Sequence, residues 1–486
     1  MIKEAVLKLG KHSIVYGLGS IGTKIISLLL LPLYTAFLTP ADYGVLQICN
    51  VLSSMIITII LMGTSSALFK VYYNDEDEDN RKVILGTVLI FYLFIAAMFL
   101  LPLIFFRNSI SSFLIGGERS GYLLLLVLVA AYFEGLITLG LAILRAKGKS
   151  FTYAIFSIVR LLIYIGLNIV FVATLKRNYV GVKEATLIAL FISVIIIFII
   201  TYKKIKWKFN RVYIKEILAI GIPLAIGGLA SWVLNMTDRY MLKFLLPEDI
   251  ALTQVGLYSL GSKISSFLHF ALVAPFMLSW GALMYSYQND PNAKNIYKNI
   301  LNIFTAIGGV LFILISFFSP EILNLISQNK DYVVAYKVVP YLTFSKLLFG
   351  IYMIFTVGVT LTKKTKYISF ANIIAAILNI ILNFIFIPKF GMIGAALASL
   401  ISFIIRTIIL YFNAQRHYHI NYDIIRISSY IFVLLGISVI QNYFQIHLFL
   451  KLILFIIIVT LTPLTGLVKY SQITSFWKIV MEKVRK

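Results

Sequence analysis

The sequence predicts an all-α integral membrane protein with 14 transmembrane helices, arranged as two six-helix bundles related as parallel repeats plus two C-terminal helices. Three observations predict this class. Of the 486 residues, 60% are hydrophobic and only 13% are charged, with a mean hydropathy of +0.95, whereas soluble domains are about half apolar and a quarter charged. Apolar stretches of about 20 residues, enough to cross the hydrocarbon of a bilayer, recur along the chain. Parts of the sequence also repeat.

Short loops separate the predicted spans and leave no room for a sizeable soluble domain. The predicted spans cover residues 13–37, 44–69, 83–106, 120–144, 151–174, 183–202, 214–244, 252–281, 297–319, 333–361, 367–388, 392–412, 424–443 and 447–468.

An internal repeat divides the chain. The segment "RAKGKSFTYAIFSIVRLLIYIGLNIVFV" (145–172) resembles "TKKTKYISFANIIAAILNIILNFIFI" (362–387), and each places an Asn, Asn168 or Asn383, at the end of a span that follows a basic turn. Six spans per copy give both copies the same orientation, which predicts an axis along the membrane normal and a cleft between two bundles. The predicted domains are 1–208, 209–415 and 416–486, the last with two extra helices and a basic tail.

The distribution of Lys and Arg predicts the side that each loop faces. Basic residues concentrate in alternate segments, beginning with residues 1–12 and ending with the tail, and the largest cluster is "YKKIKWKFNR" (202–211). Cytoplasmic loops are enriched in Lys and Arg, so both termini are predicted to be cytoplasmic. Residues 1–11 are polar and basic, and we expect no cleavable signal peptide.

The charge and cysteine content restrict the function classes. In a membrane protein, the net charge of +24 indicates basic loops and anionic lipid rather than nucleic acid. One cysteine, Cys49, allows no internal disulfide, and no Cys/His spacing for zinc is present. The acidic run 75–79 lacks the spacing of a calcium loop and is expected to be a solvated cytoplasmic loop. We expect no metal, no cofactor and no enzymatic reaction.

The stretch "GLGSIGTKI" (17–25) contains the pattern G-x-G-x-x-G of dinucleotide-binding loops. That loop needs a preceding strand and free backbone N–H groups at a helix N-terminus, whereas these glycines lie inside a predicted span. We expect the glycines to allow close helix packing. Lys24 lies near the middle of the span, on a polar stripe that reaches Tyr34, and such a stripe faces protein or water.

Several further charges fall inside predicted spans, where each costs about 2.5–3.5 kcal/mol at mid-helix on insertion scales. The bases outnumber the acids, so we expect the interior to bind an anion. Arg406 lies near a cytoplasmic span end and is expected to reach the surface by snorkelling. Arg239 could instead be an interfacial anchor with Asp238 as its counter-charge, and Glu134 could simply pair with a basic neighbour. The candidate anion-binding residues are Lys24, Arg160, Arg239, Lys263 and Lys346.

Two further segments are informative: "LLPLYTAFLTPADYGVLQ" (30–47) and "NMTDRYMLKFLLPEDIALTQVGLYSLGSKIS" (235–265). They resemble the signature regions of the polysaccharide-biosynthesis flippases, the Wzx-type O-antigen exporters of the MOP (MATE-like) superfamily. In the first, Thr39 can cap a short outer helix with Pro40 at its first position and Asp42 at its third.

The resemblance implies transport of an oligosaccharide linked to undecaprenyl pyrophosphate across the bacterial cytoplasmic membrane, for O-antigen, lipopolysaccharide or capsule assembly. It also implies membrane lipid as a partner, with a polymerase and glycosyltransferases as candidate protein partners, and a cavity lined by basic residues. Asp238 and Glu134 are candidates for ion coupling or charge pairing. The candidate glycan contacts are Tyr34, Asn168, Trp232, Asn235 and Asn383.

Other functions stay open at this point. A flippase for peptidoglycan precursors or teichoic-acid units has the same requirements. A multidrug or cation antiporter of the same fold should present carboxylates to its cargo, and a membrane scaffold would need no basic interior. A glycosyltransferase or polymerase would need acidic catalytic groups in a large loop.

Overall fold

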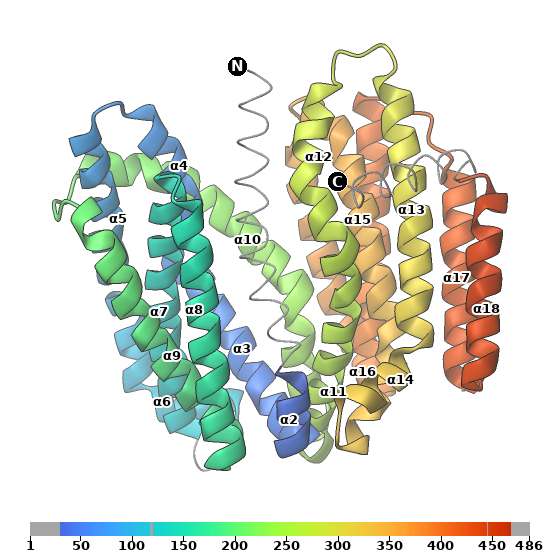
Figure 1. Ribbon diagram of the computed structural model, residues 1–486, viewed down its shortest axis with the longest axis horizontal. Coiled ribbons are helices and arrows are strands. Elements are labelled where there is room, and N and C mark those ends of the chain that lie inside the picture. The colour runs from blue at the N-terminus through green and yellow to red at the C-terminus, as the bar shows by residue number, and fades with distance from the viewer. Residues whose placement is uncertain (1–29, 117–119, 445, 468–486) are drawn as a thin grey trace, which may run out of the picture. The chain divides into compact units, whose positions relative to one another are not determined.

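The computed structural model describes residues 30–116, 120–444 and 446–467 of the chain. Every regular element in this part of the chain is a helix (Figure 1). Twelve of its helical stretches are long and apolar enough to cross a membrane. The prediction of an all-helical, multi-pass membrane protein is therefore confirmed. The count of fourteen spans stays a prediction, because most of the first predicted span, 13–37, lies outside the described residues.

The chain forms two compact units, Met1–Gly256 and Leu257–Lys486, and the division falls inside one helix, α11. The predicted domain limits at residues 208 and 415 stay predictions. The described helices of the first unit are α2 (Leu31–Phe37), α3 (Pro40–Leu61), α4 (Thr64–Asn74), α5 (Glu78–Phe105), α6 (Arg107–Leu114), α7 (Ser120–Ala146), α8 (Ser150–Asn168), the π-helix η1 (Ile169–Thr174), α9 (Asn178–Thr201), the 3₁₀-helix η2 (Tyr202–Lys204), α10 (Arg211–Leu245) and the first part of α11 (Glu248–Leu268).

The second unit continues from the rest of α11. Its further helices are the π-helix η3 (His269–Val273), α12 (Ala274–Ser286), α13 (Ala293–Phe317), α14 (Ser319–Ile326), the 3₁₀-helix η4 (Lys330–Val338), α15 (Val339–Leu361), α16 (Lys366–His417), α17 (Ile424–Phe444), α18 (Leu448–Leu461) and the 3₁₀-helix η5 (Thr462–Thr465).

The start of α3 confirms the cap read from the sequence. The backbone N–H of Asp42 donates to Thr39 Oγ1 at 3.1 Å, and the Thr39 N–H donates to Asp42 Oδ2 at 3.0 Å. This reciprocal capping box, with Pro40 as the first helical residue, satisfies two donors that a helix N-terminus otherwise leaves free. The expectation of a separate short outer helix is wrong, because the capped helix is α3 itself, which continues for 22 residues.

The two signature regions lie against each other in the first unit, at a crossing of α3 and α11. A Cβ atom on Gly44 would lie 2.0 Å from the carbonyl oxygen of Leu252, and one on Gly256 would lie 2.0 Å from that of Pro40. Only glycine allows the two backbones to approach so closely, so each signature supplies one half of the contact.

The predicted span 44–69 is interrupted. Met62 and Gly63 both adopt left-handed backbone conformations, with φ of 46° and 69°, and they separate α3 from α4. A Cβ on Gly63 would lie 2.2 Å from the carbonyl oxygen of Gly221 in α10. The break therefore coincides with a close approach of α10, which packs along α3, α4 and α5.

The 52-residue helix α16 contains both predicted spans 367–388 and 392–412. Gly391 has φ 55° and ψ −132°, outside the helical region. Residues far apart in sequence meet across this point: Asn379 Nδ2 donates to Ser399 Oγ at 3.5 Å, and a Cβ on Gly394 would lie 2.3 Å from the carbonyl oxygen of Phe386. The helix therefore doubles back at Gly391 into two antiparallel arms.

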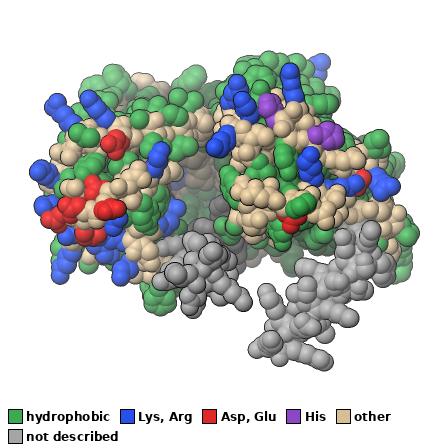
Figure 2. Space-filling view, turned by 90° about the horizontal axis from the view of Figure 1, so that it is seen from above, with side chains coloured by type: hydrophobic (Ala, Val, Ile, Leu, Met, Phe, Trp, Pro, Cys, Tyr) green, Lys and Arg blue, Asp and Glu red, His purple; other side chains and the backbone are tan. Residues whose placement is uncertain are grey.

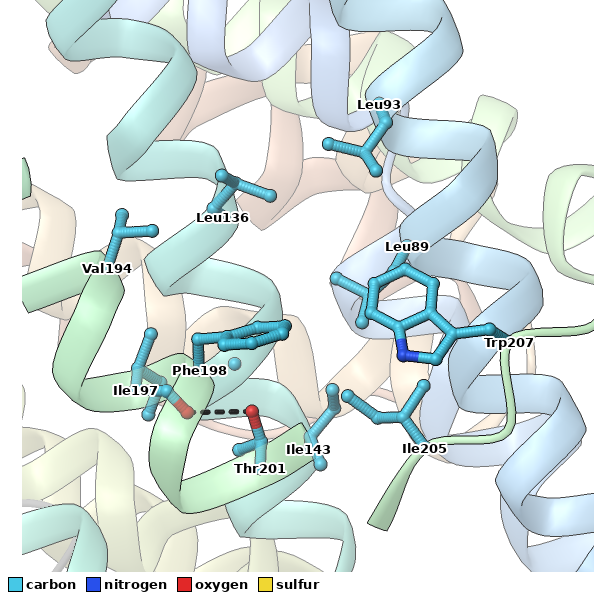
Figure 3. Close-up of a pocket in the computed structure, with 11 residues that line it drawn as sticks. Leu89, Leu93, Leu136, Ile143, Val194, Ile197, Phe198, Thr201, Ile205 and Trp207 are labelled. Atoms are coloured by element: carbon cyan, nitrogen blue, oxygen red, sulfur yellow. Dashed lines mark hydrogen bonds between the residues drawn. The ribbon is translucent and has the colours of Figure 1, made fainter. Parts of the chain in front are cut away.

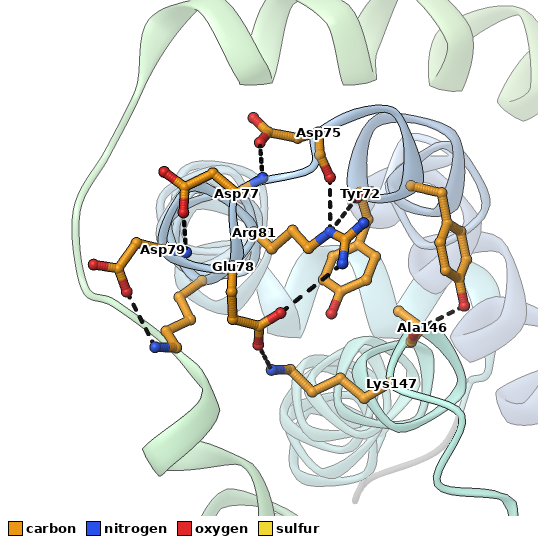
Figure 4. A network of polar contacts seen from close by, with 10 residues as sticks. Tyr72, Asp75, Asp77, Glu78, Asp79, Arg81, Ala146 and Lys147 are labelled. Carbon is orange, nitrogen blue, oxygen red and sulfur yellow. Dashed lines mark hydrogen bonds and ion pairs between the residues drawn. The ribbon is translucent and has the colours of Figure 1, made fainter.

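Polar contacts fix the connection between α4 and α5 at one end of the first unit (Figure 4). Lys147 Nζ, after α7, lies 2.7 Å from Glu78 Oε1, and the Tyr73 hydroxyl donates to the Ala146 carbonyl at 2.8 Å. The Tyr213 hydroxyl donates to Asp75 at 2.7 Å and thereby holds the pKa of that carboxyl below its ordinary value. Figure 2 shows acidic side chains gathered on this face with basic ones around them. The acidic run is solvent-facing, as predicted, and is also paired with basic neighbours.

In the second unit, Asp423 fixes the segment that precedes α17. Its carboxylate accepts from Lys298 Nζ at 2.9 Å and from Asn302 Nδ2 at 3.0 Å, both on α13. Burial pushes the pKa of Asp423 upward, but the contacts with Lys298 and Asn302 outweigh it and leave the pKa below its ordinary value.

Candidate functional site

A buried polar cluster joins α2 to α8 in the first unit. The Tyr34 hydroxyl donates to Asn168 Oδ1 at 2.8 Å and lies 3.3 Å from the Tyr164 hydroxyl. Asn168 Nδ2 donates to the Tyr164 carbonyl at 2.8 Å. Tyr34 is 5% exposed and Asn168 is fully buried. Two predicted glycan contacts, Tyr34 and Asn168, are therefore brought together, and they hydrogen-bond to each other.

The position of Asn168 depends on a local change of helix type. It is the last residue of α8, and the chain continues as the π-helix η1. π-turns inside helices are rare and occur frequently at functional sites. The wider turn lies next to α2, which packs against η1.

Arg160 and Glu134 form an ion pair between α8 and α7. Their side chains are 22% and 29% exposed, so the pair is partly accessible. In the described part of the chain, Arg160 is thus neutralised by a carboxylate, as the pairing interpretation of Glu134 predicts. The guanidinium has five N–H donors in total, and a single carboxylate does not occupy all of them.

The signature residues of α10 lie inside the protein. Asp238 is 1% and Arg239 8% exposed, and Arg239 Nη1 donates to the Asn235 carbonyl one turn earlier at 2.7 Å. Asn235 Nδ2 in turn donates to the Ser231 carbonyl at 2.8 Å, and Trp232 Nε1 donates to Ser54 Oγ on α3 at 2.8 Å. Trp232 and Asn235 are therefore held by the first unit.

Arg406 in the second unit is surrounded by aromatic rings. Its guanidinium carbon lies 4.1 Å from the ring centre of Tyr352, 4.4 Å from that of Phe403 and 5.1 Å from that of Phe349. The side chain is 2% exposed, and its buried Nε and Nη2 have no hydrogen-bond partner within the described residues. The prediction that Arg406 snorkels to the cytoplasmic surface is wrong, because its helix face turns into the unit.

Lys346 on α15 also lies beside one of these rings. We name the whole group the Arg406 cluster: Lys346, Phe349, Tyr352, Phe403 and Arg406. Lys346 Nζ is 5.9 Å from the ring centre of Phe403, the ring that also faces the guanidinium of Arg406. Two basic side chains thus share one aromatic ring. Attraction between a cation and a desolvated aromatic face is worth about 2 kcal/mol.

The remaining candidates of the second unit lie at different depths. Asn383 is fully buried, and its Nδ2 donates to Asn379 Oδ1 at 3.2 Å. Lys263 on α11 is half-buried. Lys24 lies outside the described residues, as do the glycines of residues 17–22. The predicted meeting of both sets of basic residues at one cavity involves the two units together and stays a prediction.

Sequence reasoning missed several buried polar residues. Lys183 is 6% exposed and donates to Asn50 Oδ1 at 2.7 Å, and Lys451 is 3% exposed and pairs with Glu321 at 2.7 Å. Both lysines lie near helix ends, where a basic residue is ordinary. Asn379, one turn before Asn383 on the same helix face, was detectable from that spacing. No group of metal-ligating side chains is present in the described part of the chain.

The comparisons with known proteins agree with this fold. The chain has 18% sequence identity and a TM-score of 0.74 to the structure of the lipid II flippase MurJ in an inward closed conformation, over 93% of this chain and 98% of that one. It has 15% identity and a TM-score of 0.69 to an inward-facing multidrug resistance MATE family transporter of the MOP superfamily, over 84% and 95%. A MOP superfamily transporter from Pyrococcus furiosus, described as having a binding pocket of reverse polarity, gives 15% and 0.58, over 87% and 96%.

These likenesses show that the chain shares the fold of MurJ and of the MATE transporters. A sequence model of the family described as polysaccharide biosynthesis protein matches residues 9–280, more than half of the chain, and a second, MatE, matches residues 223–385. The chain therefore belongs to the polysaccharide biosynthesis protein family, and the resemblance read from its two signatures is confirmed. No match was found among curated proteins.

Proposed function

We propose that this protein moves an oligosaccharide linked to undecaprenyl pyrophosphate from the cytoplasmic to the outer leaflet of a bacterial cytoplasmic membrane. The product serves the assembly of a surface polysaccharide such as O-antigen or capsule. Membership of the polysaccharide biosynthesis family and a fold shared with MurJ support this proposal. Both termini are cytoplasmic in the proposed orientation.

The observation that carries the proposal is the sign of the interior charge. Arg406 is buried with aromatic neighbours and two unsatisfied donors, and no carboxylate of the described residues pairs with it. Burying an uncompensated cation is expensive, so such a group is usually retained for a partner. A pyrophosphate oxygen pair could accept two parallel hydrogen bonds from a guanidinium, which is the preferred geometry of arginine and phosphate.

The substrate has three parts with different demands. The pyrophosphate cannot cross hydrocarbon unaided and needs donors that replace its water, while the sugars need polar and aromatic contacts. The polyprenyl tail is stable in lipid and needs no cover. Basic residues such as Arg160, Lys263 and Lys346 serve the first demand. Alternating exposure of the site to the two sides then completes the transfer.

Energy for outward movement is available without a coupled ion. A membrane potential that is negative inside favours the exit of an anion by about 2.3 kcal/mol per charge for each 100 mV. Asp238 stays a candidate for ion coupling. Glu134 is already paired with Arg160, so its role is to hold that guanidinium.

The test replaces Arg160, Lys263 or Lys346 by alanine and measures surface polysaccharide at equal amounts of protein. Removal of a phosphate-binding cation should lower the surface glycan at least severalfold. The exposed Lys215→Ala at the start of α10 is the matched control and should keep the wild-type amount. Wild-type glycan in all three interior variants would remove the proposed site.

Two other cargoes are favoured by specific comparisons. The likeness to MurJ favours a peptidoglycan precursor, and depletion would then cause lysis rather than loss of a surface glycan. The MatE match favours a multidrug or cation antiporter. An antiporter for cations would use free carboxylates, and Glu134 in the described interior is occupied by Arg160. Drug-resistance assays distinguish this case.

A further inference from the structure

An apolar pocket lies among α5, α7 and α9 in the first unit (Figure 3). Its volume is about 220 Å³. That is smaller than the roughly 300–1,000 Å³ of pockets for drug-sized ligands, and larger than an apolar cavity of about 150 Å³ that stays dry. The size suits a length of hydrocarbon chain. The lining residues come from α5, α7, α9 and the segment after η2: Leu89, Leu93, Leu136, Gly140, Ile143, Val194, Ile197, Phe198, Thr201, Ile205 and Trp207.

Two aromatic residues that line the pocket are exposed on the surface of the unit. Phe198 is 50% and Trp207 52% exposed, and their ring centres lie 6.4 Å apart. The neighbouring positions Ile195 and Ile199 on α9 are 44% and 62% exposed, as expected of a lipid-facing stripe. An exposed apolar stripe of this kind is expected to face lipid, so a hydrocarbon chain would reach the pocket sideways from the bilayer, past Trp207.

The segment after η2 is held across the start of α5. The Lys206 N–H donates to the Lys82 carbonyl at 3.1 Å, and Thr87 Oγ1 donates to the Lys208 carbonyl at 3.2 Å. These bonds hold the segment so that Ile205 and Trp207 close one wall of the pocket.

Three lysines, Lys147, Lys149 and Lys204, follow in sequence the end of the pocket that Ile143 and Thr201 line. Lys147 follows the lining residue Ile143 by one helical turn, and Lys204 follows Thr201 by three residues, so each extends beyond the apolar wall. Lys147 and Lys149 interact electrostatically with Lys204. Of these three, Lys147 pairs with Glu78, while Lys149 and Lys204 have no carboxylate within ion-pair distance among the described residues. Like charges repel, so this group favours an anion.

We propose that the pocket holds an acyl chain of an anionic phospholipid whose phosphate lies between Lys149 and Lys204. The lipid is a resident membrane lipid and is not the transported molecule. This assignment does not depend on the proposed cargo, since neither Arg160 nor Glu134 lines the pocket.

The test measures lipid bound to the purified full-length protein, with phosphatidylglycerol, phosphatidylcholine, undecaprenyl phosphate and inorganic phosphate as separate probes. Phosphatidylglycerol should be retained and should raise the unfolding temperature, whereas phosphatidylcholine and inorganic phosphate should not. The double variant Lys149→Ala/Lys204→Ala should weaken phosphatidylglycerol binding by about fivefold for each lysine, as expected near an anionic membrane surface. The matched control is Lys364→Ala/Lys366→Ala, which alters the corresponding basic turn of the second unit and should bind normally.

A second variant tests the hydrocarbon part independently. Val194→Phe fills the pocket and should abolish phosphatidylglycerol retention, while Ile195→Phe, one residue away on the exposed face, should not. If phosphatidylcholine binds as well as phosphatidylglycerol, the lysines do not select the lipid. If Val194→Phe and the double lysine variant both still bind phosphatidylglycerol, the proposed site is wrong. Preference for undecaprenyl phosphate over phosphatidylglycerol would also overturn the proposal, because the occupant would then be the carrier lipid.

Discussion

The two units stabilise an internal arginine in different ways. In the first, Arg160 is neutralised by Glu134, and the pair is partly accessible. In the second, Arg406 is almost fully buried and has aromatic rings in place of a carboxylate. An aromatic face attracts a cation without cancelling its charge, so Arg406 keeps the capacity to bind an anion that Arg160 has partly given up.

The difference shows that the number of basic residues in a span is a poor guide to their function. What counts is the group that each cation meets. The first unit supplies an acid at the right height on α7, and the second supplies Tyr352 and Phe349 on α15 and Phe403 on α16.

The largest effect is expected from Arg406→Leu. A leucine fills the aromatic surroundings without an unpaired charge, and apolar replacement of buried charge is often neutral or stabilising. The unfolding temperature should therefore stay the same or rise, while transport falls at least tenfold. Arg406→Lys should not restore transport, because an ammonium lacks the two parallel donors of a guanidinium. Loss of stability together with normal transport would show that Arg406 is structural.

In contrast to Arg406→Leu, Glu134→Gln should lower the stability of the protein. The variant leaves Arg160 charged and unpaired, which we expect to cost about 1–3 kcal/mol, less than for a fully buried pair because both side chains are partly accessible. Chemical denaturation measures the loss. The double variant Glu134→Gln/Arg160→Met should recover most of it, since no cation remains. If the double change costs as much as the sum of Glu134→Gln and Arg160→Met, the two residues do not interact.

Asn168→Leu should destabilise the first unit by about 1–3 kcal/mol, because the buried Tyr34 hydroxyl loses its acceptor. Tyr34→Phe combined with Asn168→Leu should be less harmful than the sum of the two changes, as expected of residues in contact. Additive effects in thermal unfolding would argue against the hydrogen bond.

The smallest effect is expected on the stability of the protein at acidic pH. The pKa of Asp423 is lowered in the folded protein, so its contribution is present at neutral pH and is lost as the pH falls through that lowered value. We expect the extra sensitivity below about pH 5, with the unfolded carboxyl titrating near 4. Asp423→Asn should flatten the dependence of the unfolding temperature on pH between about pH 5 and pH 3. Glu76→Gln, at an exposed carboxyl of the acidic run, is the comparison and should change it less.

Composition and hydropathy predicted the class, because the bilayer requires long apolar helices whatever the cargo. The capping box at Thr39 was also predictable, since all its partners lie within four residues. Contacts between helices distant in sequence were not predictable. The Tyr34–Asn168 hydrogen bond and the rings around Arg406 depend on which face each helix turns inward. The prediction for Arg406 was wrong because its distance from the end of the span indicates its depth in the membrane but not the direction in which its side chain points. The left-handed Met62 also carries no sequence signal, since such conformations favour glycine.

The most direct test measures binding of undecaprenyl pyrophosphate to the purified protein, with the uncharged undecaprenol as its matched control. We expect the pyrophosphate lipid to raise the unfolding temperature of the wild type and undecaprenol to leave it unchanged. Arg406→Leu should lose most of the effect. Equal stabilisation by both lipids, or an unchanged response in Arg406→Leu, would contradict the claim that the basic interior binds the pyrophosphate.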